Sequence, residues 1–192
     1  MRRSAFSILI LVVSGCVTSQ PFVFRPTETP NITRDDRAVA RYSVPRALPR
    51  GELFVTSQGI APLPSASKDS PQLHVRITLF NVAGEGPWAV DIRDQIVTLP
   101  GGIQVHANHV NTTAEGAPIL TILPGERIAM DLYFDLPEQA RSSDSIAAFD
   151  FIWQVSTDRK RAAGTVPFGR FLADDPNAPT RATTTIASAA PF

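Results

Sequence analysis

Apolar and polar residues alternate with a period of two in three stretches of the chain, 72–80, 127–135 and 149–155. Side chains at alternate positions of an extended strand point to the same face, so each stretch has one apolar and one polar face. A helix would need apolar residues three and four positions apart, and these stretches do not have that spacing. The alternation therefore predicts three amphipathic β-strands.

Shorter apolar runs between turn signals predict further strands. Clusters of Pro and Gly at 84–87, 100–102 and 124–125 indicate turns. Pro167 lies in the last of the weaker strands, and its missing N–H group confines that strand to a sheet edge or a bulge. Many short strands with no long amphipathic helix between them predict an all-β fold, in which two antiparallel sheets pack face to face. The weaker strands are expected at 52–57, 88–92, 95–99, 103–106, 119–123 and 164–172.

Composition divides the rest of the chain into three parts. The strands and turns span 51–173, which is a usual length for a single domain. Residues 17–50 are rich in Pro, Thr and Arg, and Pro disfavours a regular helix, so this stretch is expected to be a spacer. The alternative is that 22–24 (Phe-Val-Phe) dock on the domain as an edge segment. Residues 174–192 are rich in Ala, Thr and Pro and are predicted to be a disordered tail.

The N-terminus has the layout of a secretory signal. Two Arg residues precede an apolar run over 5–13, and small residues follow it. The run is too short to span a bilayer, which needs about 20 apolar residues. The sequence Val13-Ser14-Gly15-Cys16 resembles the lipobox of bacterial lipoproteins, in which an aliphatic residue and two small residues precede a Cys.

This resemblance implies that residues 1–15 are a lipoprotein signal peptide and that cleavage falls between Gly15 and Cys16. Cys16 would carry a diacylglyceryl group, and the Pro-rich tether over 16–50 would hold the domain on the membrane. Two acyl chains are about what stable anchoring requires. Residue 17 is Val, whereas an Asp there commonly marks inner-membrane retention in Gram-negative bacteria, so the outer membrane facing the periplasm is favoured. The alternative is a plain secretory signal in which Cys16 occurs by chance.

Two segments resemble a second group of proteins. Residues 79–82 (LFNV) lead to Gly86-Pro87-Trp88, and 123–126 (LPGE) lead to 132–137 (LYFDLP). Both segments resemble immunoglobulin-like accessory domains of unknown function in bacterial lipoproteins and secreted proteins. The resemblance covers about 70–155 and implies a single immunoglobulin-like antiparallel β-sandwich. It carries no catalytic residues.

Charge and cysteine content exclude several classes of function. The chain has 18 basic and 18 acidic residues; removing 1–15 takes away Arg2 and Arg3, which leaves 16 basic residues against 18 acidic ones, a side-chain charge of −2. Without a basic surplus we expect no nucleic-acid partner. The single Cys allows no internal disulfide.

Few residues are candidates for catalysis or metal binding. His106 and His109 are three positions apart, which would place two ligands on one face of a helix, but the flanks indicate strand and loop, so they are weak metal candidates. Asp131 and Asp150 fall on outward faces, where nothing desolvates a carboxyl group as acid catalysis requires. His74 is likewise expected to be exposed. We expect neither an enzyme nor a cofactor.

Three large side chains fall on nominally solvent-facing positions, namely Phe80, Tyr133 and Ile152. If they lie together, they would form a contact patch for a protein partner, because exposed aromatic residues often mark such sites. The sequence therefore predicts a lipid-anchored envelope protein that acts as a binding or structural accessory module, with another envelope protein as its candidate partner. The alternative is a ligand- or metal-binding lipoprotein with a pocket near the loops that hold His106 and His109.

Overall fold

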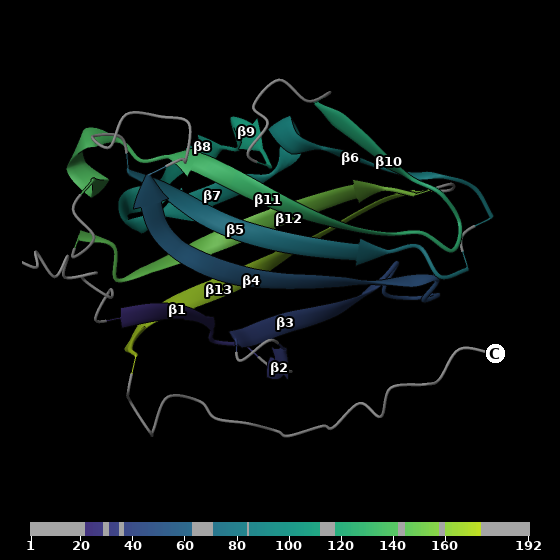
Figure 1. Ribbon diagram of the computed structural model, residues 1–192, viewed down its shortest axis with the longest axis horizontal. Helices are drawn as coiled ribbons and strands as arrows, with labels where there is room; N and C mark the ends of the chain where they lie inside the picture. The colour runs from purple at the N-terminus through teal and green to yellow at the C-terminus, as the bar shows by residue number, and fades with distance from the viewer. Residues whose placement is uncertain are drawn as a thin grey trace, which may run out of the picture.

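The computed structural model shows two antiparallel β-sheets packed face to face (Figure 1). All three strands predicted from the alternation are present, as β5 (Pro71–Phe80), β11 (Arg127–Asp135) and β12 (Ala148–Ser156). The predicted all-β sandwich is therefore confirmed. The structure describes residues 22–28, 31–34, 37–62, 71–83, 85–111, 118–141, 145–157 and 160–173.

We call the two layers sheet A and sheet B. Besides β12, sheet A contains β1 (Phe22–Pro26), β6 (Trp88–Asp91), β7 (Ile96–Leu99), β8 (Ile103–His106), β10 (Ile119–Ile122) and β13 (Arg161–Leu172). Besides β5 and β11, sheet B contains β2 (Asn31–Arg34), β3 (Arg37–Val44), β4 (Gly51–Pro62) and β9 (His109–Val110). Three short 3₁₀ turns connect strands: η1 (Ile92–Asp94), η2 (Pro100–Gly102) and η3 (Glu138–Ala140).

The order of the strands is that of an immunoglobulin domain. Sheet B places β4, β5, β11 and β9 side by side, as the A, B, E and D strands of such a domain lie. Sheet A places β7, β12 and β13 side by side, as the C, F and G strands lie. The chain passes from sheet B to sheet A after β5 and again after β11. The immunoglobulin-like architecture that the two sequence segments implied is therefore present.

The core fills the space between the sheets. The alternating apolar residues of β5 lie opposite those of its neighbour β11, with Leu79 opposite Ile128 and Leu73 opposite Phe134. A slip of one residue would turn these side chains out to solvent, so the alternation fixes the buried face and excludes such a slip. The largest fully buried side chains are Trp88, Trp153, Phe134, Phe151 and Phe168.

A buried amide continues sheet A where the C strand is interrupted. The turn η1 separates β6 from β7, and both strands pair with β12. Between them, the side-chain Nε2 of Gln95 donates to the carbonyl oxygens of Asp91 and Gln154 at 2.8 and 2.9 Å, and its Oε1 accepts from the Gln154 N–H at 3.1 Å. Gln95 thus takes the place of a backbone partner, which explains why a fully buried polar side chain is tolerated.

The expected spacer over 17–50 is wrong from residue 22 onward. The strand β1 pairs along its whole length with β13, and β3 pairs with β4. The reason is burial, because Phe22 and Phe24 enter the core from β1. The alternative, that 22–24 dock as an edge segment, is confirmed. The domain therefore begins at or before Phe22, and not at the predicted boundary at 51. Residues 1–21 and the predicted tail over 174–192 lie outside the described residues.

Pro167 lies in an inner strand and not at a sheet edge or a bulge. Its strand, β13, pairs with β12 on one side and β1 on the other, and the register with β12 is continuous. However, β1 ends at Pro26, and Thr27 donates its N–H to the Pro167 carbonyl at 2.9 Å. The N and C=O groups of one residue point to the same side of a strand, so the missing donor of Pro167 faces the point where β1 ends.

Candidate functional site

The structure does not bring the three predicted contact residues together. Phe80 lies opposite Arg127, and Tyr133 lies opposite His74 six residues further along the same strand pair, which is about 20 Å at 3.3 Å per residue. Tyr133 is also only 6% exposed. Ile152 belongs to β12 in sheet A, so it faces the opposite side of the sandwich. The predicted patch of Phe80, Tyr133 and Ile152 is therefore wrong.

Tyr133 instead belongs to a polar cluster on the outer face of sheet B. Its ring stacks on His74 with centroids 4.5 Å apart, and His74 Nε2 lies 2.9 Å from Asp131 Oδ1. Arg76 donates to both oxygens of the same carboxylate, at 2.7 and 2.9 Å. Burial opposes ionisation of Asp131, but the hydrogen bonds from His74 and Arg76 outweigh it and hold the pKa of the carboxyl well below its usual value.

This cluster corrects the expectation that His74 is exposed. His74 is largely covered and is not an exposed histidine. Asp131 and Asp150, neither of which is a predicted catalytic residue, lie in different sheets.

His106 and His109 are also separated. His106 lies in β8 of sheet A, with its Nδ1 2.8 Å from the Arg93 carbonyl oxygen, whereas His109 lies in β9 of sheet B opposite Tyr133. The Nδ1 of His109 is buried without a hydrogen-bond partner in the described part of the chain. Within that part, no group of three His, Cys, Asp or Glu side chains could hold a metal ion.

A groove of about 360 Å³ lies on the outer face of sheet B. Its floor consists of short side chains from neighbouring strands, Thr56 of β4, Thr78 of β5 and Ala129 of β11, and longer side chains rise around them. Thr78 lies opposite Phe54 on one side and opposite Ala129 on the other, whereas Thr56 lies opposite Arg76 in the next row, so the floor spans two neighbouring rows of the sheet. The lining is completed by Arg34, Arg37, Val39, Phe54, Gln58, Arg76 and Arg127.

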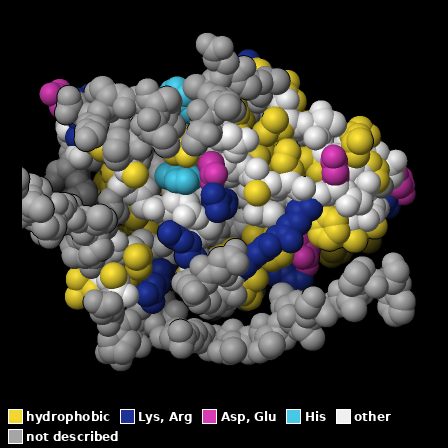
Figure 2. All heavy atoms as spheres, in the orientation of Figure 1, with side chains coloured by type: hydrophobic (Ala, Val, Ile, Leu, Met, Phe, Trp, Pro, Cys, Tyr) yellow, Lys and Arg dark blue, Asp and Glu magenta, His cyan; other side chains and the backbone are white. Residues whose placement is uncertain are grey.

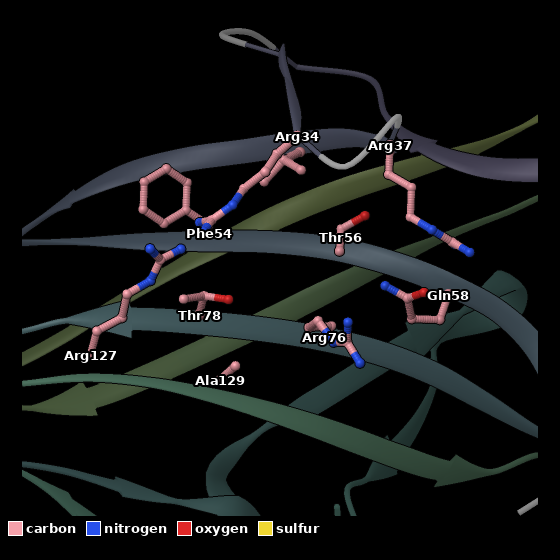
Figure 3. A pocket seen from close by; sticks show the side chains of 10 residues that line it. Arg34, Arg37, Phe54, Thr56, Gln58, Arg76, Thr78, Arg127 and Ala129 are labelled. Atoms are coloured by element: carbon pink, nitrogen blue, oxygen red, sulfur yellow. The ribbon is translucent and has the colours of Figure 1, made fainter. Parts of the chain in front are cut away.

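Four arginines line this arginine groove, and they come from four different strands. Figure 3 shows Arg34 and Arg127 reaching toward the space beside Phe54 at one end, and Arg37 and Arg76 at the other. In the space-filling view, dark-blue side chains gather on this face of the molecule (Figure 2). The guanidinium of Arg34 lies 5.5 Å from the centre of the Phe54 ring, an arrangement that holds the cation at the groove wall.

The groove arginines differ in the partners that the described residues give them. Arg76 is paired with Asp131, but none of the described lining residues is acidic, and Arg127 forms no ion pair with any residue that the structure describes. Arg37 donates one long hydrogen bond, of 3.5 Å, to the Ser57 carbonyl. In the chain, Asp35 and Asp36 separate Arg34 from Arg37, and both lie outside the described residues. A guanidinium presents five donors in a planar fork that matches carboxylate and phosphate groups, so the groove is chemically suited to anions.

The sequence interpretation missed the arginine groove because its residues are far apart in the chain. Arg37 and Arg127 are 90 positions apart by their numbers, and Arg34 and Arg37 fall in the stretch taken for a spacer. The only signal was alternation, since Arg76 and Arg127 occupy outward positions of the two firmest strands of sheet B. With the order β2-β3-β4-β5-β11 known, the four arginines would have been assigned to one sheet.

Comparisons with known proteins identify no family for this chain. No protein-family model matches the chain, and no curated protein matches it significantly. A solved structure described as a "putative lipoprotein (ycdA)" from Bacillus subtilis is 14% identical with a TM-score of 0.41; the match covers 65% of this chain and 37% of that one, so the chain spans little more than a third of that protein. An "uncharacterized beta-sandwich protein" from Clostridium difficile is 12% identical with a TM-score of 0.32 over 59% of this chain and 84% of that one. These similarities do not assign the chain to a family.

The described residues contain no helix that is long and apolar enough to cross a membrane.

Proposed function

We propose that this protein is a lipid-anchored envelope protein, held on the outer membrane and facing the periplasm, that acts as a binding module for an anionic ligand. The observation that carries the binding role is the convergence of four arginines on one groove whose lining, among the described residues, contains no acidic side chain. A volume of about 360 Å³ falls in the range of roughly 300–1,000 Å³ that is usual for ligand sites. We propose no catalytic role, because the arginine groove offers cations and hydroxyl groups but no activated nucleophile or general base.

The layout of the groove favours a ligand with at least two anionic groups. Arg127 and Arg34 lie at one end and Arg37 and Arg76 at the other, with only short side chains between them (Figure 3). A single small anion would contact one pair of arginines, whereas a longer one would contact both pairs. Charge-assisted hydrogen bonds contribute about 1.5–3 kcal/mol each, so engaging both ends raises affinity strongly.

Calorimetric titration of the lipid-free chain with tripolyphosphate and with inorganic phosphate tests this role. We expect tripolyphosphate to bind more tightly, and Arg127→Gln or Arg37→Gln to weaken it about tenfold or more each, which is at least about 1.4 kcal/mol. Arg141→Gln is the matched control, because Arg141 is exposed and lies outside the groove. Equal weakening by the control variant, or no loss in either groove variant, would show that anions do not bind there.

The anchor has its own test. Metabolic labelling with a palmitate analogue should mark the wild-type chain, and Cys16→Ala should abolish the label because the chain has no other Cys. Labelling of both proteins would rule out the anchor. Mass spectrometry of the mature N-terminus should find Cys16 as its first residue.

A further inference from the structure

The folded domain begins very close to the proposed lipid anchor. Only residues 17–21 separate Cys16 from β1, which starts at Phe22. Phe22 is itself fixed in the sandwich, because it is buried and pairs with Leu172 at the end of β13. The chain between lipid and domain is therefore five residues long, where the predicted tether over 16–50 would have been about seven times longer.

The reach of this short segment follows from backbone dimensions. Six Cα steps from Cys16 to Phe22 span at most about 21 Å when fully extended. A flexible coil of that length has an end-to-end distance of about 13 Å. The headgroup layer above the hydrocarbon is itself about 5–8 Å thick, half the difference between the full bilayer and its core. Phe22 therefore stays within about 16 Å of the headgroup surface even at full extension.

The strand β13 shows which part of the domain lies there. It runs from Leu172, beside Phe22, to Arg161 at the opposite end of the sandwich, and its 12 residues span about 36 Å (Figure 1). Leu172 is 66% exposed, and the guanidinium of Arg170 lies over the Phe22 ring at 5.2 Å. Asp174 and Asp175 follow in the sequence but lie outside the described residues, so the inference rests on the reach of the linker and not on charge.

We propose that the end of the sandwich formed by Phe22 and Leu172, here called the anchor end, rests on the bilayer that holds the lipid. This inference rests on the proposed lipidation of Cys16. The partner of the anchor end is a phospholipid surface, and the exposed Leu172 lies in the interfacial layer. The opposite end, which carries the β12–β13 turn at Lys160, points away from the membrane. The domain then works at the membrane surface and not at the end of a long spacer.

Fluorescence quenching in vesicles tests the orientation with the full-length mature lipoprotein. Acylation blocks the only natural thiol, so a dye on Ala173→Cys reports the anchor end and a dye on Lys160→Cys reports the opposite end; both positions are exposed. In phosphatidylethanolamine–phosphatidylglycerol vesicles that contain headgroup-labelled quencher lipid, we expect the dye at position 173 to lose several-fold more fluorescence than the dye at 160. Equal quenching at the two positions would overturn the inference.

A longer linker provides the control. Inserting ten Gly-Ser residues between Pro21 and Phe22 raises the end-to-end distance of the coil from about 13 to about 22 Å, so quenching at 173 should fall clearly. Unchanged quenching would mean that other contacts, and not the short linker, hold the anchor end on the lipid. Intact mass measurement distinguishes the two proposals: an unlipidated Cys16 refutes the anchor itself, whereas a lipidated chain with equal quenching refutes only the orientation.

Discussion

Replacing Phe24 with Ala tests whether β1 is part of the cooperative core. Phe24 is 4% exposed, and its ring makes edge-to-face contacts with Phe149 at 5.2 Å and with Phe22 at 5.6 Å. Phe149 in turn stacks on Phe168 at 4.8 Å, so Phe24 joins β1 to a row of aromatic rings that continues into β12 and β13. If residues before 51 were a spacer, none of these contacts would contribute to stability.

The expected loss can be worked from these contacts. Truncating a buried Phe to Ala costs about 3–5 kcal/mol, because apolar surface is lost and a cavity remains. We expect the lower end, about 3 kcal/mol, because β1 is an edge strand that can shift toward the space. A domain has a free energy of unfolding of roughly 5–15 kcal/mol, so this is a large fraction of the total. For a chain of this length, Tm should fall by roughly 6–12 °C.

Equilibrium unfolding of the lipid-free chain in urea, followed by tryptophan fluorescence, measures the effect through Trp88 and Trp153, which are both buried in the core. Val23→Ala is the matched control, since Val23 lies in the same strand but is only partly buried, and it should cost less than about 1 kcal/mol. If Phe24→Ala changes the free energy of unfolding no more than Val23→Ala does, β1 does not belong to the cooperative unit.

Two further predictions concern polar groups. Asp131→Asn should lower the free energy of unfolding by about 1–2 kcal/mol at neutral pH, a modest value because the partly exposed Arg76 is screened by solvent. The pKa of Asp131 is lower in the folded state than in the unfolded state. The stabilisation by the ionised carboxylate is therefore complete above the unfolded pKa of about 4 and is lost as the pH falls through the folded pKa. Unfolding curves from pH 7 to pH 2 should therefore show the gap to wild type closing below about pH 4, and a constant gap would refute this. Gln95→Leu should lower the free energy of unfolding by roughly 3 kcal/mol or more, because the carbonyls of Asp91 and Gln154 and the Gln154 N–H lose their hydrogen-bond partners. Hydrogen exchange of the Gln154 amide should become faster in this variant. An unchanged exchange rate would contradict the bridging role of Gln95.

The sandwich could be predicted from the sequence where strands are long and alternate strictly. In β5 and β11 every second residue is large and apolar, which identifies the strand and its buried face, whereas the register between the two strands comes from the structure. In β3 the inward residues are Ala40, Tyr42 and Val44, and a small side chain followed by a partly exposed aromatic gives a much weaker pattern. Alternation alone therefore misses this strand.

The prolines of residues 17–50 explain why the prediction of a spacer was wrong. Their number predicts a spacer, yet the structure places two of them at the ends of strands: Pro26 is the last residue of β1, and Pro45 directly follows β3. Pro is compatible with a sheet at such positions because its missing N–H group is not needed in the ladder. Counting prolines therefore excludes a helix but not a strand, and only the pairing partners of β1 and β3, residues 168–172 and 51–55, identify the stretch as part of the sandwich.

The arginine groove and the short linker follow from this correction. Arg34 and Arg37 become groove residues only when β2 and β3 extend sheet B, and Cys16 comes within about 21 Å of the domain only when β1 is folded. The balanced charge of the whole chain argues against nucleic acid, but it says little about one face, because pairing distant strands can collect basic residues there. A neutral chain can therefore offer an anion-binding surface. If both proposals hold, that surface lies within the length of one sandwich, about 36 Å, of the headgroups, so its ligand must be a component that approaches the membrane to that distance.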